Sequence, residues 1–187
     1  MNHADRTAQF TEYVIAKQLW LRRLAYLLCR DWHRSDDLVQ SALAKLYANW
    51  HRIDQSTSPD GYARTVLVNT FISEERGRRW KRVVLVRDVE DGESAPERDL
   101  DDVLDLRKAL IHLPARQRAT LVLRYYSELS VDETAQILGC STGTVKSQTS
   151  HALTTLRRLM HIEETDEAIA NAATAIGRIA PAYNEKG

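Results

Sequence analysis

Residues 131–150 carry a spacing of small and apolar residues that is typical of two helices joined by a tight turn. They read VDETAQILGCSTGTVKSQTS, with Ala135, Gly139 and Val145 at the fifth, ninth and fifteenth positions. A small alanine lets the two helices approach, a glycine takes the left-handed turn, and a valine fills the gap between the helices. The pattern predicts a helix-turn-helix, a unit that places its second helix in the major groove of DNA.

The second helix of this unit is expected to be capped by Ser141 and to run through Arg158. Its inward face is apolar and comprises Val145, Ala152, Leu156 and Met160. Its outward face is polar and basic and comprises Lys146, Ser147, Ser150, His151, Thr154 and Arg158. Side chains of these types hydrogen-bond phosphates and base edges. A helical hairpin with a solvated face is the simpler alternative, but such a face ordinarily carries acidic residues as well.

A second basic cluster, Arg76–Arg82, has Trp80 inside it. Arginine and lysine bind phosphates, and an aromatic ring can stack on an unpaired base. Phosphate binding is favoured here over a solvated helix end. For Trp80, stacking on a base and simple packing against protein remain equal alternatives.

Motifs for catalysis or metal binding are missing from the sequence. It contains no glycine-rich phosphate loop, no nucleophile elbow and no HExxH. Cys29 and Cys140 lie in separate segments without a nearby cysteine or histidine at ligand spacing, and the histidines are scattered. We therefore expect a protein that is not an enzyme and has no catalytic residues, metal, cofactor or small-molecule substrate.

The elements that position these residues are predicted to be helices. Apolar residues recur at helical spacing in both halves of the chain, and the one alternating stretch, Val83–Val86, is too short for a sheet. In the first half, Ser35 is expected to cap a helix with Asp36 and Asp37 in its first turn. A further helix is expected to start near Pro59 and to run from Tyr62 through Arg79. Two more helices are expected over Leu104–Leu110 and over Ala115–Tyr126.

Charge divides the chain into segments. Its 187 residues hold 26 basic and 26 acidic side chains, but residues 1–85 carry 14 basic against 9 acidic ones, and residues 106–161 carry 8 against 3. Residues 86–105 between them carry 2 basic and 9 acidic side chains, with the Gly and Pro of a linker. We predict an all-α fold of two small helical domains joined by an acidic linker, the second containing the helix-turn-helix. The predicted segments are a first domain, 1–85; a linker, 86–103; a second domain, 104–161; and an acidic C-terminal extension, 162–187.

No apolar run approaches the roughly 20 residues that span a bilayer. The first residues are polar and lack the apolar core of a signal peptide. We expect a cytoplasmic protein that does not enter a membrane.

Three segments together resemble a known family. Leu113–Met160 is similar to the fourth domain of bacterial RNA polymerase sigma factors. Asp36–Trp50, DDLVQSALAKLYANW, resembles the polymerase-binding helix of sigma domain two, and Gly61–Arg79, GYARTVLVNTFISEERGRR, resembles the helix that engages the minus-10 element. Two domains with a short linker and no third domain between them are typical of the extracytoplasmic-function group. The resemblance covers about residues 10–161.

The resemblance implies a transcription initiation factor that binds core RNA polymerase and directs it to promoter DNA at minus-10 and minus-35 elements. An anti-sigma factor is a further candidate partner. The implied polymerase-binding residues are Asp36, Asp37, Gln40 and Lys45. The implied minus-10 residues are Arg64, Asn69, Arg76, Arg78, Arg79 and Trp80, with the loop 54–60 pocketing a flipped base. The implied minus-35 residues are Thr144, Lys146, Ser147, Ser150 and His151.

The sequence departs from the family pattern at four places. Ser41 stands where many relatives carry an acid, Ala42 where many carry Phe, and Ser73 where Asp is common. His151 stands where relatives often have Arg, which can grip guanine with two hydrogen bonds. We therefore expect looser or shifted base preference at His151.

Two other classes of protein remain as alternatives. A stand-alone helix-turn-helix regulator would bind a palindromic site without polymerase, and a helical adaptor that binds only protein would leave the basic strip of residues 146–158 unexplained. The extension after Met160 has a weakly apolar stripe and is expected either to dock on the second domain or to fray.

Overall fold

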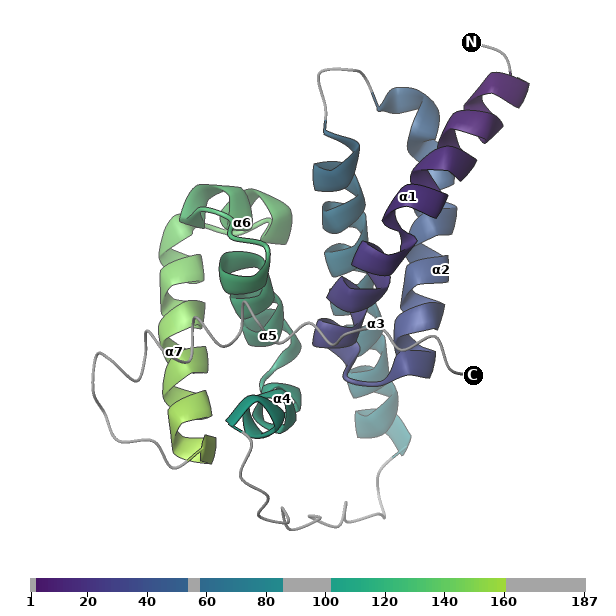
Figure 1. Cartoon of the computed structure of the whole chain (residues 1–187). Helices are drawn as coiled ribbons and strands as arrows, with labels where there is room; N and C mark the ends of the chain where they lie inside the picture. Colours follow the sequence, from purple (N-terminus) through teal and green to yellow (C-terminus); the bar gives the residue numbers. More distant parts are fainter. Residues whose placement is uncertain (1–2, 54–57, 86–101, 161–187) are drawn as a thin grey trace.

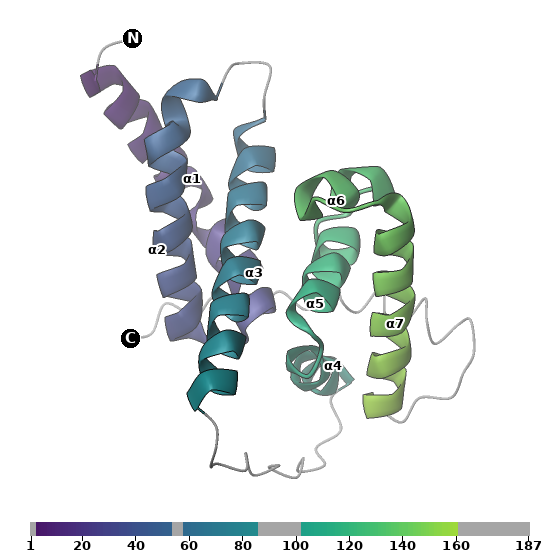
Figure 2. The ribbon, with the colours of Figure 1, turned by 180° about the vertical axis from the view of Figure 1, so that it is seen from behind.

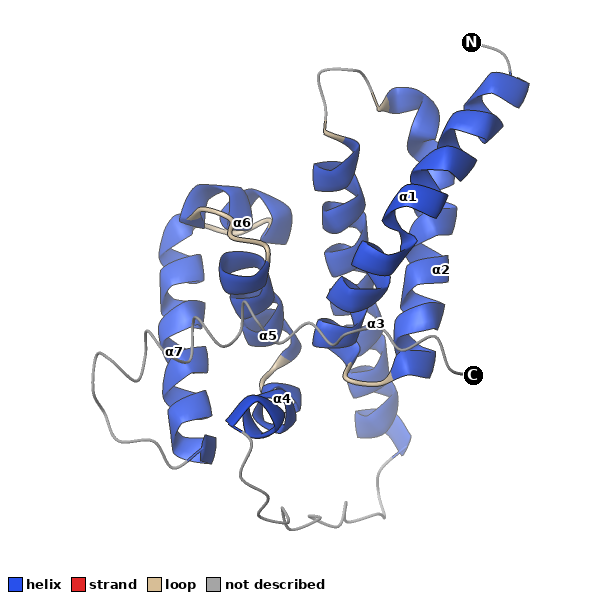
Figure 3. Cartoon of the chain, in the orientation of Figure 1, coloured by secondary structure: helices blue, strands red, loops and turns tan. Residues whose placement is uncertain are grey.

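The computed structural model describes residues 3–53, 58–85 and 102–160. Within these ranges every regular element is a helix, as predicted (Figure 3). The first three helices are α1 (His3–Cys29), α2 (Trp32–Asn49) and α3 (Pro59–Leu85). The remaining four are α4 (Asp102–Ile111), α5 (Ala115–Leu121), α6 (Val131–Leu138) and α7 (Thr142–Met160). The predicted linker, apart from Asp102 and Val103, and the C-terminal extension lie outside the described residues.

The first domain packs three long helices side by side (Figure 1). Their apolar faces share fully buried Leu24, Leu38, Leu67 and Phe71. The chain reverses between α1 and α2 at Arg30, which takes the left-handed conformation with φ of 59°. A short 3-10 turn, Trp50–Arg52, follows α2.

The start of α2 differs from the prediction. The helix begins at Trp32, and the carboxylate of Asp31 caps it by accepting a hydrogen bond from the Arg34 N–H at 2.8 Å. Ser35 is therefore not the cap. It lies in the next turn, fully buried, and its hydroxyl donates to the Asp31 carbonyl at 2.5 Å. Asp36 and Asp37 accordingly lie beyond the first turn, where the helix dipole favours acidic groups less.

The second domain packs α4, α5 and α6 against α7. The helix predicted over Ala115–Tyr126 is α-helical only to Leu121 and continues as a π-helical turn, Val122–Tyr126. The Ser127 N–H donates to the Val122 carbonyl at 3.0 Å and closes this wider turn. The π-helical turn therefore leads the chain into the short loop that precedes α6.

The two domains also pack on each other. Both views place α5 and α6 beside α3 (Figures 1 and 2). One continuous apolar core joins Leu67 and Phe71 of the first domain to Leu110 and Leu121 of the second. The face of α3 that is turned away from α1 and α2 is therefore covered in part by the second domain.

Candidate nucleic-acid and polymerase interfaces

Local hydrogen bonds define the first helix of the helix-turn-helix. The Ser130 hydroxyl accepts from the Glu133 N–H at 3.1 Å, while Glu133 Oε2 accepts from the Ser130 N–H at 2.7 Å, forming a capping box. Hydrogen bonds from the side chain and backbone of Ser130 lower the pKa of the Glu133 carboxyl below its ordinary value. Gly139 ends α6 with φ of 59°, the left-handed conformation that the spacing predicted.

The second helix begins as predicted. The Ser141 hydroxyl accepts from the Thr144 N–H at 3.1 Å and forms a further hydrogen bond with the Thr144 hydroxyl at 2.9 Å. Val145 and Ala152 are fully buried, Leu156 is nearly so, and Ala135 of α6 is also buried. The helix-turn-helix geometry predicted from small and apolar spacing is thus confirmed.

The predicted minus-35 residues lie together on the outer side of α7. Lys146, Ser147, Ser150 and His151 are exposed, and Thr144 is half-buried at the first turn. The Ser147 hydroxyl donates to the Thr144 carbonyl at 3.0 Å and can still accept a hydrogen bond. This surface offers hydroxyl, ammonium and imidazole groups from one helix face, which suits hydrogen bonding to base edges and phosphates.

The predicted minus-10 residues lie along α3 in two different environments. Asn69, Arg76, Arg78 and Arg79 are exposed, as is Trp80. The indole of Trp80 is 71% exposed, so it does not pack in the core. Arg64 is half-buried, and its guanidinium lies 5.6 Å from the ring centroid of Trp20 on α1. Residues 54–57 of the predicted base-pocketing loop and the side chains of Lys81 and Arg82 lie outside the described part of the chain.

The predicted polymerase-binding residues lie on α2 and divide into two pairs. Asp36 is held by two hydrogen bonds from Arg22 of α1, at 2.6 and 2.9 Å, and the Lys45 ammonium donates to the Thr70 hydroxyl of α3 at 3.1 Å. Asp37 and Gln40 are exposed on the same helix. On the opposite face of α2, Leu38, Val39 and Leu46 are buried.

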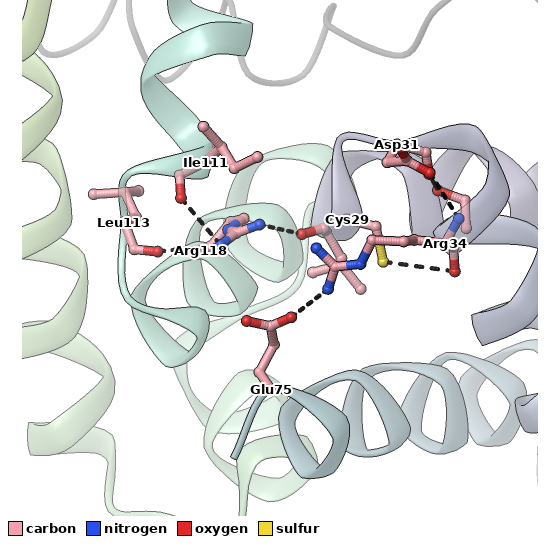
Figure 4. A network of polar contacts seen from close by, with 9 residues as sticks. Cys29, Asp31, Arg34, Glu75, Ile111, Leu113 and Arg118 are labelled. Atoms are coloured by element: carbon pink, nitrogen blue, oxygen red, sulfur yellow. Dashed lines mark hydrogen bonds and ion pairs between the residues drawn. The ribbon is translucent and has the colours of Figure 1, made fainter. Parts of the chain in front are cut away.

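Sequence reasoning missed a polar network between the domains (Figure 4). Arg118 of α5 is only 5% exposed, and its guanidinium donates to the Leu28 carbonyl of α1. Nearby, Arg34 of α2 forms an ion pair with Glu75 of α3. Residues 115–123 contain two arginines, Arg116 and Arg118, and nothing in the sequence marks the second one as buried.

The described part of the chain shows neither a membrane-spanning helix nor a cluster of metal ligands. No helix in the described part of the chain is long and apolar enough to cross a membrane. Across residues 3–53, 58–85 and 102–160, no three His, Cys, Asp or Glu side chains gather as a metal site would require.

Comparisons with known proteins match both domains. The sigma-70 region 2 family matches residues 14–81, and the sigma-70 region 4 family matches residues 104–156. The RNA polymerase sigma-E factor of Streptomyces coelicolor is 35% identical over 165 residues, covering 84% of this chain and 89% of that protein. The ECF RNA polymerase sigma factor EcfG of Rhodopseudomonas palustris is 29% identical, covering 86% and 90%. The chain belongs to the extracytoplasmic-function group of RNA polymerase sigma factors.

A solved structure agrees with this sigma factor over most of its length. The sigma factor RpoE of Bartonella quintana, in complex with the anti-sigma factor NepR, superposes with a TM-score of 0.66 at 27% identity. The match covers 83% of this chain and 99% of that one. The predicted fold class and family are therefore confirmed. A stand-alone regulator is not favoured, because the first domain matches sigma region 2.

Proposed function

We propose that this sigma factor binds core RNA polymerase through α2 and directs it to promoters by contacting minus-35 DNA with α7 and minus-10 DNA with α3. The observation that carries the proposal is the outer face of α7. There, Lys146, Ser147, Ser150 and His151 are all exposed on a helix whose opposite face is locked into the domain by Val145. A rigid helix with free polar groups is what recognition in the major groove requires.

At the minus-35 element, the four exposed side chains contact the groove and Thr144 lies near the DNA backbone. The first turn of α7 carries no acidic residue, so its N-terminal dipole attracts a phosphate without opposition from its own side chains. His151 offers a single imidazole hydrogen bond where an arginine offers two. Base preference at that position is therefore weaker than a bidentate contact would give.

At the minus-10 element, the exposed amide of Asn69 contacts a base, and the arginines at the end of α3 bind phosphates. Arg76, Arg78 and Arg79 are exposed, and none lies in the core. Trp80 presents its ring to solvent beside them, which supports stacking on an unpaired base over packing. Arg64 contributes by holding α3 against Trp20 of α1 as well as by its charge.

The polymerase contact is proposed for the α2 face with Asp36, Asp37, Gln40 and Lys45. Asp37 and Gln40 supply free polar groups. Asp36 and Lys45 are already tied to α1 and α3, so their bonds also fix the orientation of α2. Polymerase binding at this face therefore depends on how α1, α2 and α3 pack.

The remaining roles follow from the same assignment. This sigma factor performs no chemistry of its own, because RNA synthesis belongs to the polymerase that it recruits, and it acts in the cytoplasm, where the polymerase works. Residues 1–85 form the polymerase and minus-10 domain, and residues 104–161 form the minus-35 domain. An anti-sigma factor is a proposed partner, since the B. quintana relative was solved in complex with one.

The proposal is tested by separating promoter opening from polymerase binding. Asn69→Ala removes an exposed amide from α3, on a different helix from the polymerase face. We expect normal binding to core polymerase, measured by fluorescence anisotropy, and a clear loss of open complex, measured by permanganate reactivity of unpaired thymines. Gln18→Ala, an exposed amide on α1, is the control and should change neither. Equal loss of both activities in Asn69→Ala would contradict the assignment.

A further inference from the structure

Arg118 is a charged residue buried at the boundary between the two domains. It belongs to α5 of the second domain, and its guanidinium donates to the Leu28 carbonyl of the first (Figure 4). It also donates to the carbonyls of Ile111 and Leu113 in its own domain, each at 3.3 Å. One side chain thus joins the α4–α5 turn to the end of α1.

The Leu28 carbonyl is one that needs a partner. The last four carbonyls of an α-helix have no partner within the helix, and Leu28 is the next-to-last residue of α1. A cation at a helix C-terminus is also favoured by the helix dipole. Arg118 therefore acts as a C-terminal cap that is supplied to α1 by the other domain.

Two side chains of α3 complete the surroundings of Arg118. Its guanidinium carbon lies 5.5 Å from the centroid of the Phe71 ring, a cation–π distance. Glu75 is the acidic group that most favours its charge, although that carboxylate is itself paired with Arg34. When the domains separate, Arg118 keeps only the carbonyls of Ile111 and Leu113 among these partners. The hydrogen bond between Arg118 and the Leu28 carbonyl is polar, so water can replace it on both partners.

The closed arrangement places the second domain beside residues proposed to bind minus-10 DNA. Arg76 and Arg79 of α3 line a cleft of about 700 Å³ whose other wall includes Arg116 and Gln117 of α5. Farther along α3, the charge of Arg64 helps to lower the pKa of Glu133 on α6. Two of the six proposed minus-10 residues thus line the cleft between the domains. The minus-35 surface of α7 stays exposed in the same arrangement.

The distance between promoter elements gives a second reason to regard this arrangement as inactive. Minus-35 and minus-10 are about 25 base pairs apart by their names, or roughly 85 Å along B-form DNA at about 3.4 Å per pair. A compact chain of 187 residues has a radius of gyration of only about 16 Å. Two domains that share one core therefore do not reach both elements until they separate.

We propose that Arg118 is an interdomain latch, which keeps the free sigma factor closed with the second domain packed against its minus-10 helix. The inference rests on the proposed function for the meaning of the covered surface, while the latch itself rests on the contacts of Arg118. Opening replaces the contacts with Leu28 and Phe71 by water and frees the face of α3 that the second domain packs against. Removal of the latch accordingly shifts the population toward the open form.

The test compares Arg118→Met with Arg116→Met. Methionine keeps much of the arginine volume but lacks its charge and its hydrogen-bond donors. Arg116 is an exposed arginine of the same helix that lines the same cleft, so it controls for the loss of one positive charge. Radius of gyration is measured by small-angle X-ray scattering. DNA binding is measured by anisotropy with a labelled single-stranded oligonucleotide of about 20 random nucleotides, a probe of the basic end of α3.

We expect Arg118→Met to have a larger radius of gyration than the parent and Arg116→Met to match the parent. If the open form is a tenth of the parent population, complete loss of the latch tightens oligonucleotide binding by about tenfold. An unchanged radius in folded Arg118→Met overturns the latch, as does equal expansion of both variants. Expansion with unchanged oligonucleotide binding supports the latch and contradicts the minus-10 assignment instead.

Glu75→Gln tests the latch by a substitution in the first domain. It keeps the proposal testable if Arg118→Met disturbs the folding of the second domain. The substitution keeps the shape of a side chain that is 17% exposed and removes the charge beside Arg118. We expect a smaller expansion in the same direction. If Arg118→Met does not melt cooperatively, a radius for Glu75→Gln equal to that of the parent overturns the proposal.

Discussion

The two domains present their proposed functional residues in different ways. In the second domain, the candidate DNA-binding side chains of α7 project from a helix fixed by local devices, namely the Ser130–Glu133 capping box, Gly139 and the Ser141 cap. In the first domain, half of the candidate polymerase residues are bonded to neighbouring helices, Asp36 to Arg22 and Lys45 to Thr70. Recognition and folding are thus separate in the second domain and coupled in the first.

This difference indicates how each domain responds to substitution. Changing an exposed residue of α7 alters DNA preference with little effect on the free energy of unfolding. Changing a bonded residue of α2 alters both, because the same side chain orients the helix. The following predictions test that contrast from the largest expected effect to the smallest.

Substitutions at exposed and at hydrogen-bonded residues of the polymerase face should differ in their effect on stability. Asp37→Lys places a cation where the exposed carboxylate contacts polymerase, and like-charge or unpaired contacts of this kind cost about 2 kcal/mol, or roughly thirtyfold in affinity. Its melting temperature should stay that of the parent. Asp36→Lys should weaken polymerase binding and also lower the melting temperature. It removes the half-exposed ion pair between Asp36 and Arg22, which is worth only about 0.5 kcal/mol, and it places two positive charges side by side.

Binding is measured by anisotropy with core polymerase and stability by calorimetry. The contrast fails if Asp37→Lys loses as much stability as Asp36→Lys, or if Asp37→Lys binds polymerase normally.

The turn of the helix-turn-helix should depend on the backbone of Gly139. Gly139→Val forces a β-branched residue into the left-handed conformation, at a cost of about 1 to 2 kcal/mol in the free energy of unfolding. An added Cβ would meet no atom within 4 Å, so crowding does not contribute. Asn tolerates this conformation, and Gly139→Asn should therefore cost clearly less in chemical denaturation. Similar losses for the two variants would rule out the conformational explanation.

The capping box should contribute less, and its contribution should depend on pH. Ser130→Ala removes the helix cap and should lower the free energy of unfolding by about 1 kcal/mol at neutral pH. The pKa of Glu133 is lower when folded, so the stabilisation is present above its unfolded pKa, near 4.3, and is lost as pH falls through the folded pKa. The gap between the melting temperatures of parent and variant should narrow below about pH 4. A constant gap would exclude a role for the carboxylate.

The smallest effect is expected at His151. Its exposed imidazole makes at most a single bond to a base edge, so His151→Ala should relax preference at one base by less than the 1 to 3 kcal/mol of a bidentate contact. Selection from a randomised minus-35 library by the holoenzyme measures this. Melting should be unaffected, in keeping with the separation of recognition and folding. An unchanged consensus would remove His151 from the base-contacting set.

The sequence predicted best where structure is determined locally. Ala135, Gly139 and Val145 act within one turn and its two helices, so their spacing alone specified the motif. The start of α2 was misplaced because two capping candidates, Asp31 and Ser35, lie four residues apart. The choice between them depends on burial of Ser35 by the other helices. The capping box at Ser130 and Glu133 was also readable from spacing, but was overlooked.

The contacts between domains were beyond prediction from sequence patterns. Arg118 reads as an ordinary helix residue until α1 supplies a carbonyl from 90 positions earlier in the chain. The stacking of Arg64 on Trp20 likewise joins helices distant in sequence. Such pairings depend on three-dimensional packing, which periodicity does not encode.

The most direct test of the central assignment is reconstituted transcription. The purified sigma factor is mixed with core RNA polymerase and fragmented genomic DNA of the source organism, and transcript 5′ ends are mapped by sequencing. The assignment predicts discrete start sites that share elements near minus-10 and minus-35 and are absent with core polymerase alone. Start sites no different from those of core polymerase, together with tight binding of the free protein to a palindromic duplex, would contradict it.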